Sequence, residues 1–143
     1  MSTSKSFIPS GSKTNVMKKI INTNQAPAPI GPYSQAVVAG NMLFTSGQIA
    51  INPQTGLLET DDIKSETNLV MKNLAAVLTA AGTDFSAVIK CSIFIKDMNQ
   101  FAEINSVYGT YFKEDAAPAR ETVEVARLPK DVNVEISAIA LIP

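Results

Sequence analysis

The hydrophobic residues of this chain follow a helical spacing in two segments and a strand-like alternation in several others. From about Asp62 to Ala81, apolar residues recur every three or four positions, as they do along one face of an amphipathic α-helix. Asp61 or Asp62 can cap the first turn of this helix, and Gly82 can end it. The pattern therefore predicts a long helix that packs on a core.

A second, shorter helix is predicted after Asp97, because Gln100 follows three positions later as in a capping box. The apolar face of this helix consists of Phe101, Ile104, Tyr108, Tyr111 and Phe112. Both predicted helices are apolar on one side only, so each is expected to cover one face of a sheet.

Short runs of β-branched and apolar residues, bounded by turn signals, predict six strands. These runs lie near residues 18–22, 36–38, 42–45, 87–95, 120–126 and 132–139. Gly40-Asn41 fits the two-residue turn of a hairpin, and the prolines of 25–32 exclude a helix or a central strand there. A turn at Leu128-Pro129-Lys130-Asp131 separates the last two runs.

The elements follow the order β-β-β-α-β-α-β-β, without an internal repeat. We predict an α+β domain of two layers, in which a six-stranded, mostly antiparallel sheet carries both helices on one face. The opposite face would then be uncovered, and apolar residues on an uncovered sheet face tend to be buried against another subunit. The pattern therefore favours an oligomer.

A chain of 143 residues and 15.2 kDa fits one domain, which we place at residues 17–143. Residues 1–16 are rich in Ser, Thr and Lys and are interpreted as a flexible extension or a remnant of cloning. No secretory signal core is present, so the expected location is the cytoplasm. The net charge of -1 offers no basic surface to nucleic acid or to an anionic membrane, and no apolar run is long enough to span a bilayer.

Two features of the composition narrow the chemistry. The sequence has no histidine, which excludes Ser-His and Cys-His catalytic pairs and most zinc and haem sites. Its single cysteine, Cys91, lies in a predicted buried strand and is interpreted as inert core. Acid–base work must therefore fall to carboxylates, tyrosine, lysine or bound water.

Arg120 and Glu135 are the first candidates for chemistry, since each is a charged residue in a predicted strand. The planar guanidinium of Arg120 matches a carboxylate or a phosphate, although pairing with a surface acid is the simpler interpretation. Glu135 lies in a strand that otherwise reads as buried on both faces, where a carboxylate is costly unless it is paired or hydrogen-bonded. In a tight hairpin Glu135 would lie opposite Glu124, not Arg120. Either the last two strands are not simple neighbours, or the two residues meet through a pocket wall or a subunit interface.

Several motifs of the sequence resemble the signature of one known family. In the C-terminal part these are Pro118-Ala119-Arg120, Val123-Glu124-Val125-Ala126-Arg127-Leu128-Pro129-Lys130-Asp131 and Val134-Glu135-Ile136. Upstream they are Ile30-Gly31-Pro32-Tyr33-Ser34-Gln35, Thr45-Ser46-Gly47-Gln48 and Val107-Tyr108. From about Lys19 to its end, the chain closely resembles the Rid (reactive intermediate deaminase) family, also catalogued as YjgF, and in particular its archetypal imine deaminases.

The resemblance implies a chorismate-mutase-like fold and a homotrimer whose sheets line a central barrel, with sites between subunits. It implies hydrolysis of 2-imino acids, such as 2-iminopropanoate and 2-iminobutanoate, to 2-oxo acids and ammonia, which protects against intermediates of pyridoxal-phosphate enzymes. No metal or organic cofactor is implied. Arg120 would hold the substrate carboxylate, and Glu135 would position the attacking water. The implied substrate-binding residues are Tyr33, Ser46, Gly47, Asn105 and Thr122.

Other interpretations stay open on the sequence alone. Tyr33 can be a lid on the core, Ser46-Gly47 a plain strand end and Asn105 a solvated helix flank. A trimer that only binds a small carboxylate, or that chaperones a partner, would need Arg120 but not Glu135. An endoribonuclease or translation inhibitor, a label that the family has also carried, is disfavoured by the missing histidine and the missing basic surface.

Glu121-Thr122 departs from the family pattern, in which the arginine is often followed by Ser and then by Cys or Thr. By alternation Thr122 shares the face of Arg120, where its hydroxyl or its carbonyl can contact a ligand or a water, and no thiol nucleophile is available there. Glu121 points to the opposite face, so its charge is expected to affect packing or an interface rather than the chemistry.

Overall fold

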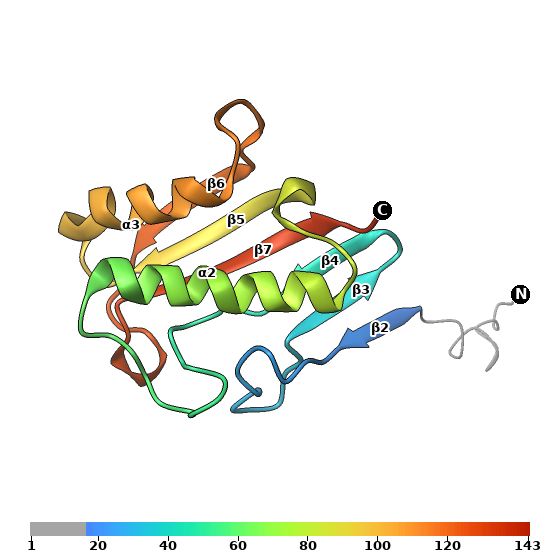
Figure 1. Cartoon of the computed structure of the whole chain (residues 1–143), viewed down its shortest axis with the longest axis horizontal. Coiled ribbons are helices and arrows are strands. Elements are labelled where there is room, and N and C mark those ends of the chain that lie inside the picture. The colour runs from blue at the N-terminus through green and yellow to red at the C-terminus, as the bar shows by residue number, and fades with distance from the viewer. Residues whose placement is uncertain (1–16) are drawn as a thin grey trace, which may run out of the picture.

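The computed structural model describes residues 17–143, so the predicted extension at 1–16 lies outside the described residues (Figure 1). Its sheet has six strands in the order β2-β3-β4-β7-β5-β6. The strands are β2 (Lys18–Ile21), β3 (Ala36–Ala39), β4 (Met42–Thr45), β5 (Val88–Ile95), β6 (Ala119–Glu124) and β7 (Val134–Leu141). The helices are α2 (Ile63–Ala80) and α3 (Phe101–Tyr108). Short 3₁₀ turns are η1 (Phe85–Ala87), η2 (Met98–Gln100), η3 (Gly109–Tyr111), η4 (Glu114–Ala116) and η5 (Pro129–Asp131).

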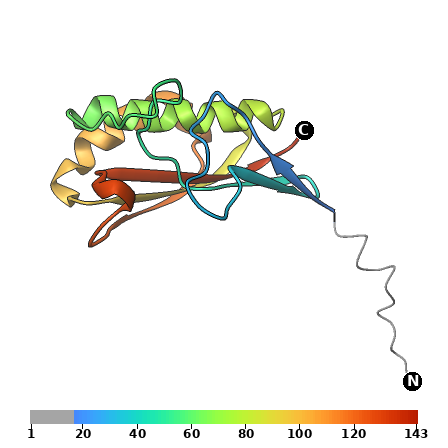
Figure 2. The ribbon, with the colours of Figure 1, turned by 90° about the horizontal axis from the view of Figure 1, so that it is seen from below.

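These elements confirm the predicted α+β fold. Both helices lie on the same face of the sheet, and within residues 17–143 no layer covers the opposite face (Figure 2). Neighbouring strands are antiparallel except for β5 and β6, which run parallel. The β3–β4 hairpin turns at Gly40 as expected, and the φ of 61° there is a left-handed conformation that glycine adopts without steric cost.

Helix α2 begins where the sequence predicts it. The Asp62 carboxylate accepts a hydrogen bond from the Ser65 N–H and so satisfies one free donor of the first turn. The buried stripe of the helix includes Val70, Leu74 and Leu78, each 0% exposed. Burying one such side chain contributes about 1.5–3 kcal/mol, so this stripe holds the helix on the sheet.

The second helix differs from its prediction at both ends. Asp97 caps the turn η2 rather than α3, because its carboxylate accepts a hydrogen bond from the Asn99 N–H. The predicted capping box is therefore wrong, since the Gln100 side chain, directly before α3, makes no capping hydrogen bond. The helix ends at Tyr108, and Tyr111 lies in the following turn η3.

The last two strands are not neighbours in the sheet. β5 lies between β6 and β7, so the turn at 128–131 connects two strands that are separated by a third. In this register Arg120 pairs with Cys91 of β5, and Glu135 pairs with Phe94 of β5. A tight hairpin is thereby excluded, and the alternative that the strands are not simple neighbours is the one observed.

The two faces of the sheet differ in burial. The face under the helices supplies core residues such as Leu43 and Ile136, which are fully buried. The uncovered face, in contrast, exposes large apolar side chains. Four of them are 41–42% exposed, namely Ile20, Phe44, Val123 and Leu141. Strand β7 alternates between buried and half-buried positions. The expectation that β7 is buried on both faces is therefore wrong, because its second face is the uncovered one.

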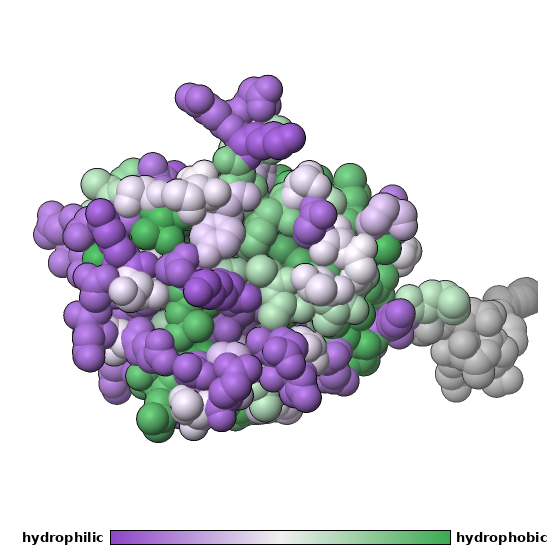
Figure 3. Space-filling view, viewed as in Figure 1, coloured by the Kyte–Doolittle hydropathy of each residue, from purple (hydrophilic) through white to green (hydrophobic). Residues whose placement is uncertain are grey.

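The surface on the helix side mixes hydrophilic and hydrophobic residues (Figure 3). Hydrophilic side chains project at the top of this view, where the chain passes from α3 to β6. This turn contains Lys113, Glu114 and Asp115. Within residues 17–143, no helix combines the length and the apolar character needed to cross a bilayer.

Candidate active site

Two pockets contain the two charged residues that the sequence singles out, one residue in each. Glu135 lines the first pocket and Arg120 lines the second, and the two pockets share no lining residue. Cys91 and Phe94, the β5 partners of Arg120 and Glu135, are three positions apart. Side chains at an odd spacing along a strand point to opposite faces of the sheet. The two candidate residues are therefore on opposite faces within one chain.

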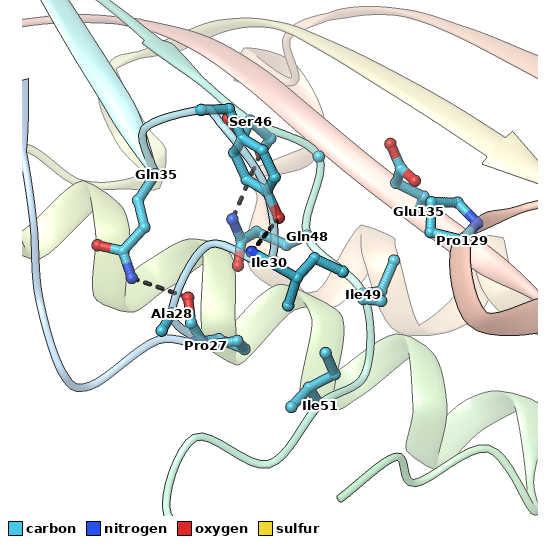
Figure 4. A pocket seen from close by; sticks show the side chains of 12 residues that line it. Pro27, Ala28, Ile30, Gln35, Ser46, Gln48, Ile49, Ile51, Pro129 and Glu135 are labelled. Carbon is cyan, nitrogen blue, oxygen red and sulfur yellow. Dashed lines mark hydrogen bonds between the residues drawn. The ribbon is translucent and has the colours of Figure 1, made fainter. Parts of the chain in front are cut away.

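The pocket around Glu135, called here the Glu135 pocket, has a volume of about 310 Å³. Its lining residues are Pro27, Ala28, Ile30, Tyr33, Gln35, Ser46, Gly47, Gln48, Ile49, Ile51, Pro129 and Glu135. Glu135 and Pro129 lie on one side of the pocket, and Gln35, Ala28 and Pro27 lie on the other (Figure 4). Because much of the lining is apolar, the pocket is a weakly hydrating environment for a carboxyl group.

Glu135 is the acid of this pocket. It is half-buried on the uncovered face of β7, and burial raises the pKa of its carboxyl group above the ordinary value. No donor among residues 17–143 lowers this pKa by a hydrogen bond to the carboxylate. A carboxyl group with a raised pKa is suited to accept and return a proton closer to neutral pH.

Gly47 packs directly against the Glu135 side chain. A Cβ atom at position 47 would lie 2.1 Å from Oε2 and 2.6 Å from Cδ of Glu135. These distances are far inside van der Waals contact, so glycine is what allows the carboxylate its position. The role of Gly47 as a direct ligand contact stays a prediction, and the structure adds a steric role that the sequence pattern does not reveal.

Tyr33 and Ser46 also line the Glu135 pocket, with their polar groups engaged in different ways. Tyr33 is 48% exposed, and its hydroxyl accepts a hydrogen bond from the Ile30 N–H at 3.2 Å. The Ser46 hydroxyl donates to the Ser34 carbonyl at 2.5 Å, and the Ser46 N–H donates to the Gln35 carbonyl at 2.9 Å. Ser46 thus fixes the loop, while the exposed ring of Tyr33 is available to a ligand.

Gln35 is a residue of this pocket whose role the sequence pattern does not predict. It is 2% exposed, and its amide group donates to the carbonyls of Thr23 and Pro27, both at 2.9 Å. The same amide accepts a hydrogen bond from the Thr23 N–H at 2.7 Å. Gln35 therefore holds the proline-containing loop that forms one wall. The sequence signal for this role is the position of Gln35 at the end of the motif at 30–35.

The second pocket, called here the Arg120 pocket, has a volume of about 450 Å³. Arg120 Nη1 donates a hydrogen bond to Asn105 Oδ1 at 2.6 Å. The guanidinium carbon lies 5.5 Å from the ring centroid of Phe101 and 5.1 Å from that of Tyr108, within cation–π distance. These contacts orient the guanidinium and, among residues 17–143, leave most of its N–H donors free for an anion. Asn105 is thus brought together with Arg120.

Tyr108 and Cys91 pack beneath this arginine. Tyr108 is 5% exposed and Cys91 is 0% exposed. Burial raises the pKa of the Tyr108 hydroxyl and that of the Cys91 thiol, so both groups stay protonated at neutral pH. Cys91 is core, as predicted. Tyr108 lies on the apolar face of the second helix, as predicted. Its contact with Arg120 was not predicted, because no local sequence pattern shows that strand β6 packs next to this helix.

Strand β6 alternates as the sequence predicts. The register places Arg120 and Thr122 on the covered face and Glu121 on the uncovered face. The Thr122 hydroxyl is buried and has no hydrogen-bond partner within residues 17–143. Glu121 forms an ion pair with Lys90 at 2.9 Å and accepts a hydrogen bond from the Ser92 hydroxyl. The charge of Glu121 is thus compensated on the uncovered face, away from the Arg120 pocket.

Comparisons with known proteins place this chain among related sequences. The family model described as Endoribonuclease L-PSP matches residues 23–142. A RutC family protein of Pyrococcus horikoshii is 56% identical over 124 residues, which cover 87% of this chain and 98% of that protein. TdcF of Escherichia coli, provisionally named a reactive intermediate deaminase, is 50% identical over 127 residues, which cover 87% and 98% of the two chains.

Solved structures show the same fold at similar identity. The crystal structure of Escherichia coli TdcF with bound serine superimposes with a TM-score of 0.82 at 49% identity, covering 87% of this chain and 99% of that chain. YyfA of Yersinia pestis, a protein of unknown function from the Rid family, gives 0.85 at 48% identity, with coverage of 87% and 99%. The chain therefore belongs to the Rid/YjgF family, whose matching model carries the description Endoribonuclease L-PSP.

Proposed function

We propose that this protein hydrolyses small 2-imino acids, such as 2-iminopropanoate and 2-iminobutanoate, to 2-oxo acids and ammonia, and so removes reactive intermediates of pyridoxal-phosphate enzymes. Arg120 binds the substrate carboxylate, and Glu135 activates the water. The observation that carries the proposal is the Glu135 carboxyl group, which lies in a largely apolar pocket with a raised pKa. The name of the relative TdcF supports the same class of chemistry.

We also propose that the site forms between copies of the chain, in a homotrimer. Two observations support this assembly. Arg120 and Glu135 line separate pockets on opposite faces, so they do not meet within one chain. The uncovered face of the sheet exposes large apolar residues such as Phe44 and Val123, whose burial against a second copy would contribute about 25 cal/mol per Å². The Arg120 pocket of one copy then faces the Glu135 pocket of the next.

The reaction asks for little beyond positioning and one acid–base group. The water oxygen attacks the carbon of the protonated imine while the carboxylate of Glu135 takes a proton from the water, which gives a tetrahedral carbinolamine. The carboxyl group then gives this proton to the nitrogen and takes the hydroxyl proton as the C–N bond breaks, the C=O bond forms and ammonia leaves, and it finally loses that proton to the ammonia or to water. Because free imines already hydrolyse in water, a contribution of about 10²–10⁴ from general acid–base catalysis is sufficient.

The remaining site residues have supporting roles in this proposal. Asn105 orients the guanidinium, and Gly47 leaves the carboxylate its space. The exposed ring of Tyr33 closes over the substrate, and Ser46 fixes the loop behind it. The buried hydroxyl of Thr122 supplies a polar group on the side of Arg120, where its hydrogen-bonding capacity is unused within the described chain.

A coupled assay tests the proposal directly. A serine or threonine dehydratase generates 2-aminoacrylate or its four-carbon analogue, and the release of keto acid is followed with and without the protein. Arg120→Ala is expected to abolish the acceleration, because the substrate carboxylate loses its partner. Lys72→Ala, a change at an exposed position of α2, is the control and keeps full activity. Near-full activity of Arg120→Ala would remove the assignment.

RNA cleavage is the second candidate, because the description of the matching family model names an endoribonuclease. Cleavage of RNA by highly purified wild-type protein, lost in Arg120→Ala, would favour it over the deaminase. Glu135→Gln distinguishes the deaminase from a trimer that only binds a carboxylate ligand. A binding protein keeps its affinity for 2-oxobutanoate in this variant and shows no imine turnover in the wild type, whereas the deaminase loses turnover on substitution.

A further inference from the structure

Helix α2 buries three polar side chains where an amphipathic helix carries apolar residues, and two of them, Glu66 and Asn73, bond to segments outside the helix. Glu66 is 0% exposed and Asn73 is 2% exposed. Residues at this spacing of seven lie on the same side of an α-helix, two turns apart. Both side chains therefore point into the interior, Glu66 toward the segment that precedes Glu135 and Asn73 toward the segment that contains Ile49 and Ile51.

Glu66 is bonded to the segment that leads into β7. Its carboxylate accepts a hydrogen bond from the Asn133 backbone N–H at 2.8 Å and another from the Asn133 side-chain amide at 2.7 Å. The Asn133 carbonyl in turn accepts a hydrogen bond from the Lys96 N–H at 3.0 Å. Asn133 lies two residues before Glu135 and two residues after the end of the turn η5, which contains two non-glycine residues with positive φ. Glu66 thus fixes the backbone that presents Glu135.

Asn73 is bonded to the segment that follows β4. Its side-chain amide donates to the Ile49 carbonyl at 3.0 Å and to the Ile51 carbonyl at 2.9 Å. The Ile51 N–H also donates to the Ile49 carbonyl at 2.8 Å, so this short turn is held from inside and from the helix. Ile49 and Ile51 both extend their side chains at the pocket (Figure 4). Asn73 thus fixes the apolar wall of the pocket.

Stability alone does not account for Glu66. Burial raises the pKa of the Glu66 carboxyl group even though the hydrogen bonds from Asn133 lower it. The lost hydration of the carboxylate is therefore not fully offset by its partners. A buried carboxyl group whose hydrogen bonds both go to one residue, Asn133, is suited to positioning the segment that contains this residue.

We propose that Glu66 and Asn73 are positioning residues, through which α2 sets the placement of Glu135 relative to the isoleucine wall that receives the side chain of the substrate. Neither residue touches the substrate. The kinetic part of the inference rests on the proposed deaminase function, whereas its structural part does not. Misplacing a reacting group by about 1 Å can lower a rate by about 10²-fold, so the two hydrogen-bond pairs have a measurable consequence.

The test compares Glu66→Ala, Glu66→Gln and Asn73→Leu in the coupled assay. Glu66→Ala is expected to lower kcat about tenfold or more with KM within about threefold, because Arg120 still holds the carboxylate. Asn73→Leu is expected to raise KM about fivefold with a smaller change in kcat, since it disturbs the wall rather than the acid. Glu66→Gln lies between Glu66→Ala and the wild type, because its amide oxygen can accept one of the two hydrogen bonds.

Thr67→Val is the matched control. Thr67 is 0% exposed on the same helix, and its hydroxyl donates to the Ile63 carbonyl within α2, so the change removes a buried hydrogen bond that does not reach the pocket. This variant is expected to keep both kinetic constants. If kcat and KM change together in all four variants, in proportion to the loss in Tm, Glu66 and Asn73 are structural and the inference is wrong.

Hydrogen–deuterium exchange provides a readout that does not depend on activity. Exchange at 133–135 is expected to rise in Glu66→Ala, and exchange at 49–51 is expected to rise in Asn73→Leu, each without the other. Unchanged exchange at both segments would contradict the positioning role. Full activity of Arg120→Ala and Glu135→Gln would instead contradict the proposed function, so the two failures are distinguishable.

Discussion

The two pockets differ in how the surrounding residues interact with the charged side chain that each contains. In the Glu135 pocket, burial raises the pKa of the carboxyl group, and no hydrogen bond within the described chain counteracts the rise. In the Arg120 pocket, the guanidinium lies between an amide oxygen and two aromatic rings that orient it. A direct ion pair between the two residues would lower the carboxyl pKa and occupy the guanidinium. The fold places the two residues on opposite faces. Within the described chain, the Glu135 carboxyl group therefore keeps its raised pKa, and the Arg120 guanidinium keeps donors for an anion.

The comparison assigns acid–base work to one pocket and carboxylate binding to the other, and Glu135→Gln tests this division most severely. We expect kcat to fall about 10²–10⁴-fold with a change in KM of only a few-fold, because the carboxylate grip at Arg120 is untouched. In the wild type, kcat/KM is expected to fall as the pH drops through the raised pKa of Glu135, where the base becomes protonated. Keto-acid release measured from pH 4 to 8 checks both effects.

The fall in kcat/KM at acidic pH also distinguishes the role of one pocket from that of the other. Any residual activity of Arg120→Ala is expected to keep the fall in kcat/KM at acidic pH, whereas the residual activity of Glu135→Gln is expected to lose it. The control is Glu103→Gln on the exposed side of α3, which should leave rate and pH profile unchanged. The same fall at acidic pH in Glu135→Gln would mean that another group is the base.

Mixing the two inactive variants tests whether the pockets of different copies combine. When equal amounts of Arg120→Ala and Glu135→Gln are unfolded together and refolded, random trimers should contain about one intact site in four, because each site takes its arginine and its glutamate from different copies. Recovery of about a quarter of the wild-type activity is therefore expected. Each variant refolded alone is the control, and no recovery in the mixture would place both residues of a site on one chain.

The fold was largely predictable because its signals are local. The apolar periodicity of α2 and its cap at Asp62 lie within one segment, as does the Gly40-Asn41 turn, and all of them appear as predicted. The predicted capping box failed because the turn η2 is inserted between Asp97 and α3, and a 3₁₀ turn and an α-helix have the same start signals. The partner of β6 in the sheet, in contrast, depends on long-range packing that no local pattern specifies.

The site was predictable as a set of residues but not as an arrangement. The motifs drew attention to Arg120 and Glu135, yet their faces depend on the register of both β6 and β7 against β5. The contact of Gly47 with Glu135 is equally hidden, since it joins the chain after β4 to the last strand. Gln35 bonds to a loop about ten residues away in sequence, which periodicity cannot reveal.

Gly47→Ala sharpens the comparison, because it disturbs the Glu135 pocket and leaves the Arg120 pocket intact. The new Cβ would meet the carboxylate at 2.1 Å, and the flexible side chain of Glu135 is expected to move away rather than unfold the protein. We expect kcat to fall roughly tenfold, as for a reacting group moved by a fraction of 1 Å, with Tm almost unchanged. Coupled-assay kinetics and a thermal melt measure the two quantities.

Gly56→Ala is the opposite control for this prediction. Its Cβ would meet nothing within 4 Å, but its φ of +74° is strained for alanine, so it should lower Tm and keep activity. Equal losses of activity in both variants would show that the contact with Glu135 is not what matters at position 47.

The smallest expected effect is on thermal stability, and it depends on whether the carboxyl group of Glu135 is charged. Because burial raises the pKa of Glu135 above the unfolded value of 4.5, its stabilising contribution is complete below pH 4.5 and is lost as the pH rises through the folded pKa. Glu135→Gln removes this loss, so its Tm should equal that of the wild type near pH 4 and exceed it by roughly 1–3 °C at pH 7. Glu66 also has a raised pKa, but it is present in both proteins and cancels in the difference. A Tm difference that is independent of pH would show that the carboxyl group of Glu135 is as well hydrated as in the unfolded chain, and the Glu135 pocket would then not provide the environment that its proposed base requires.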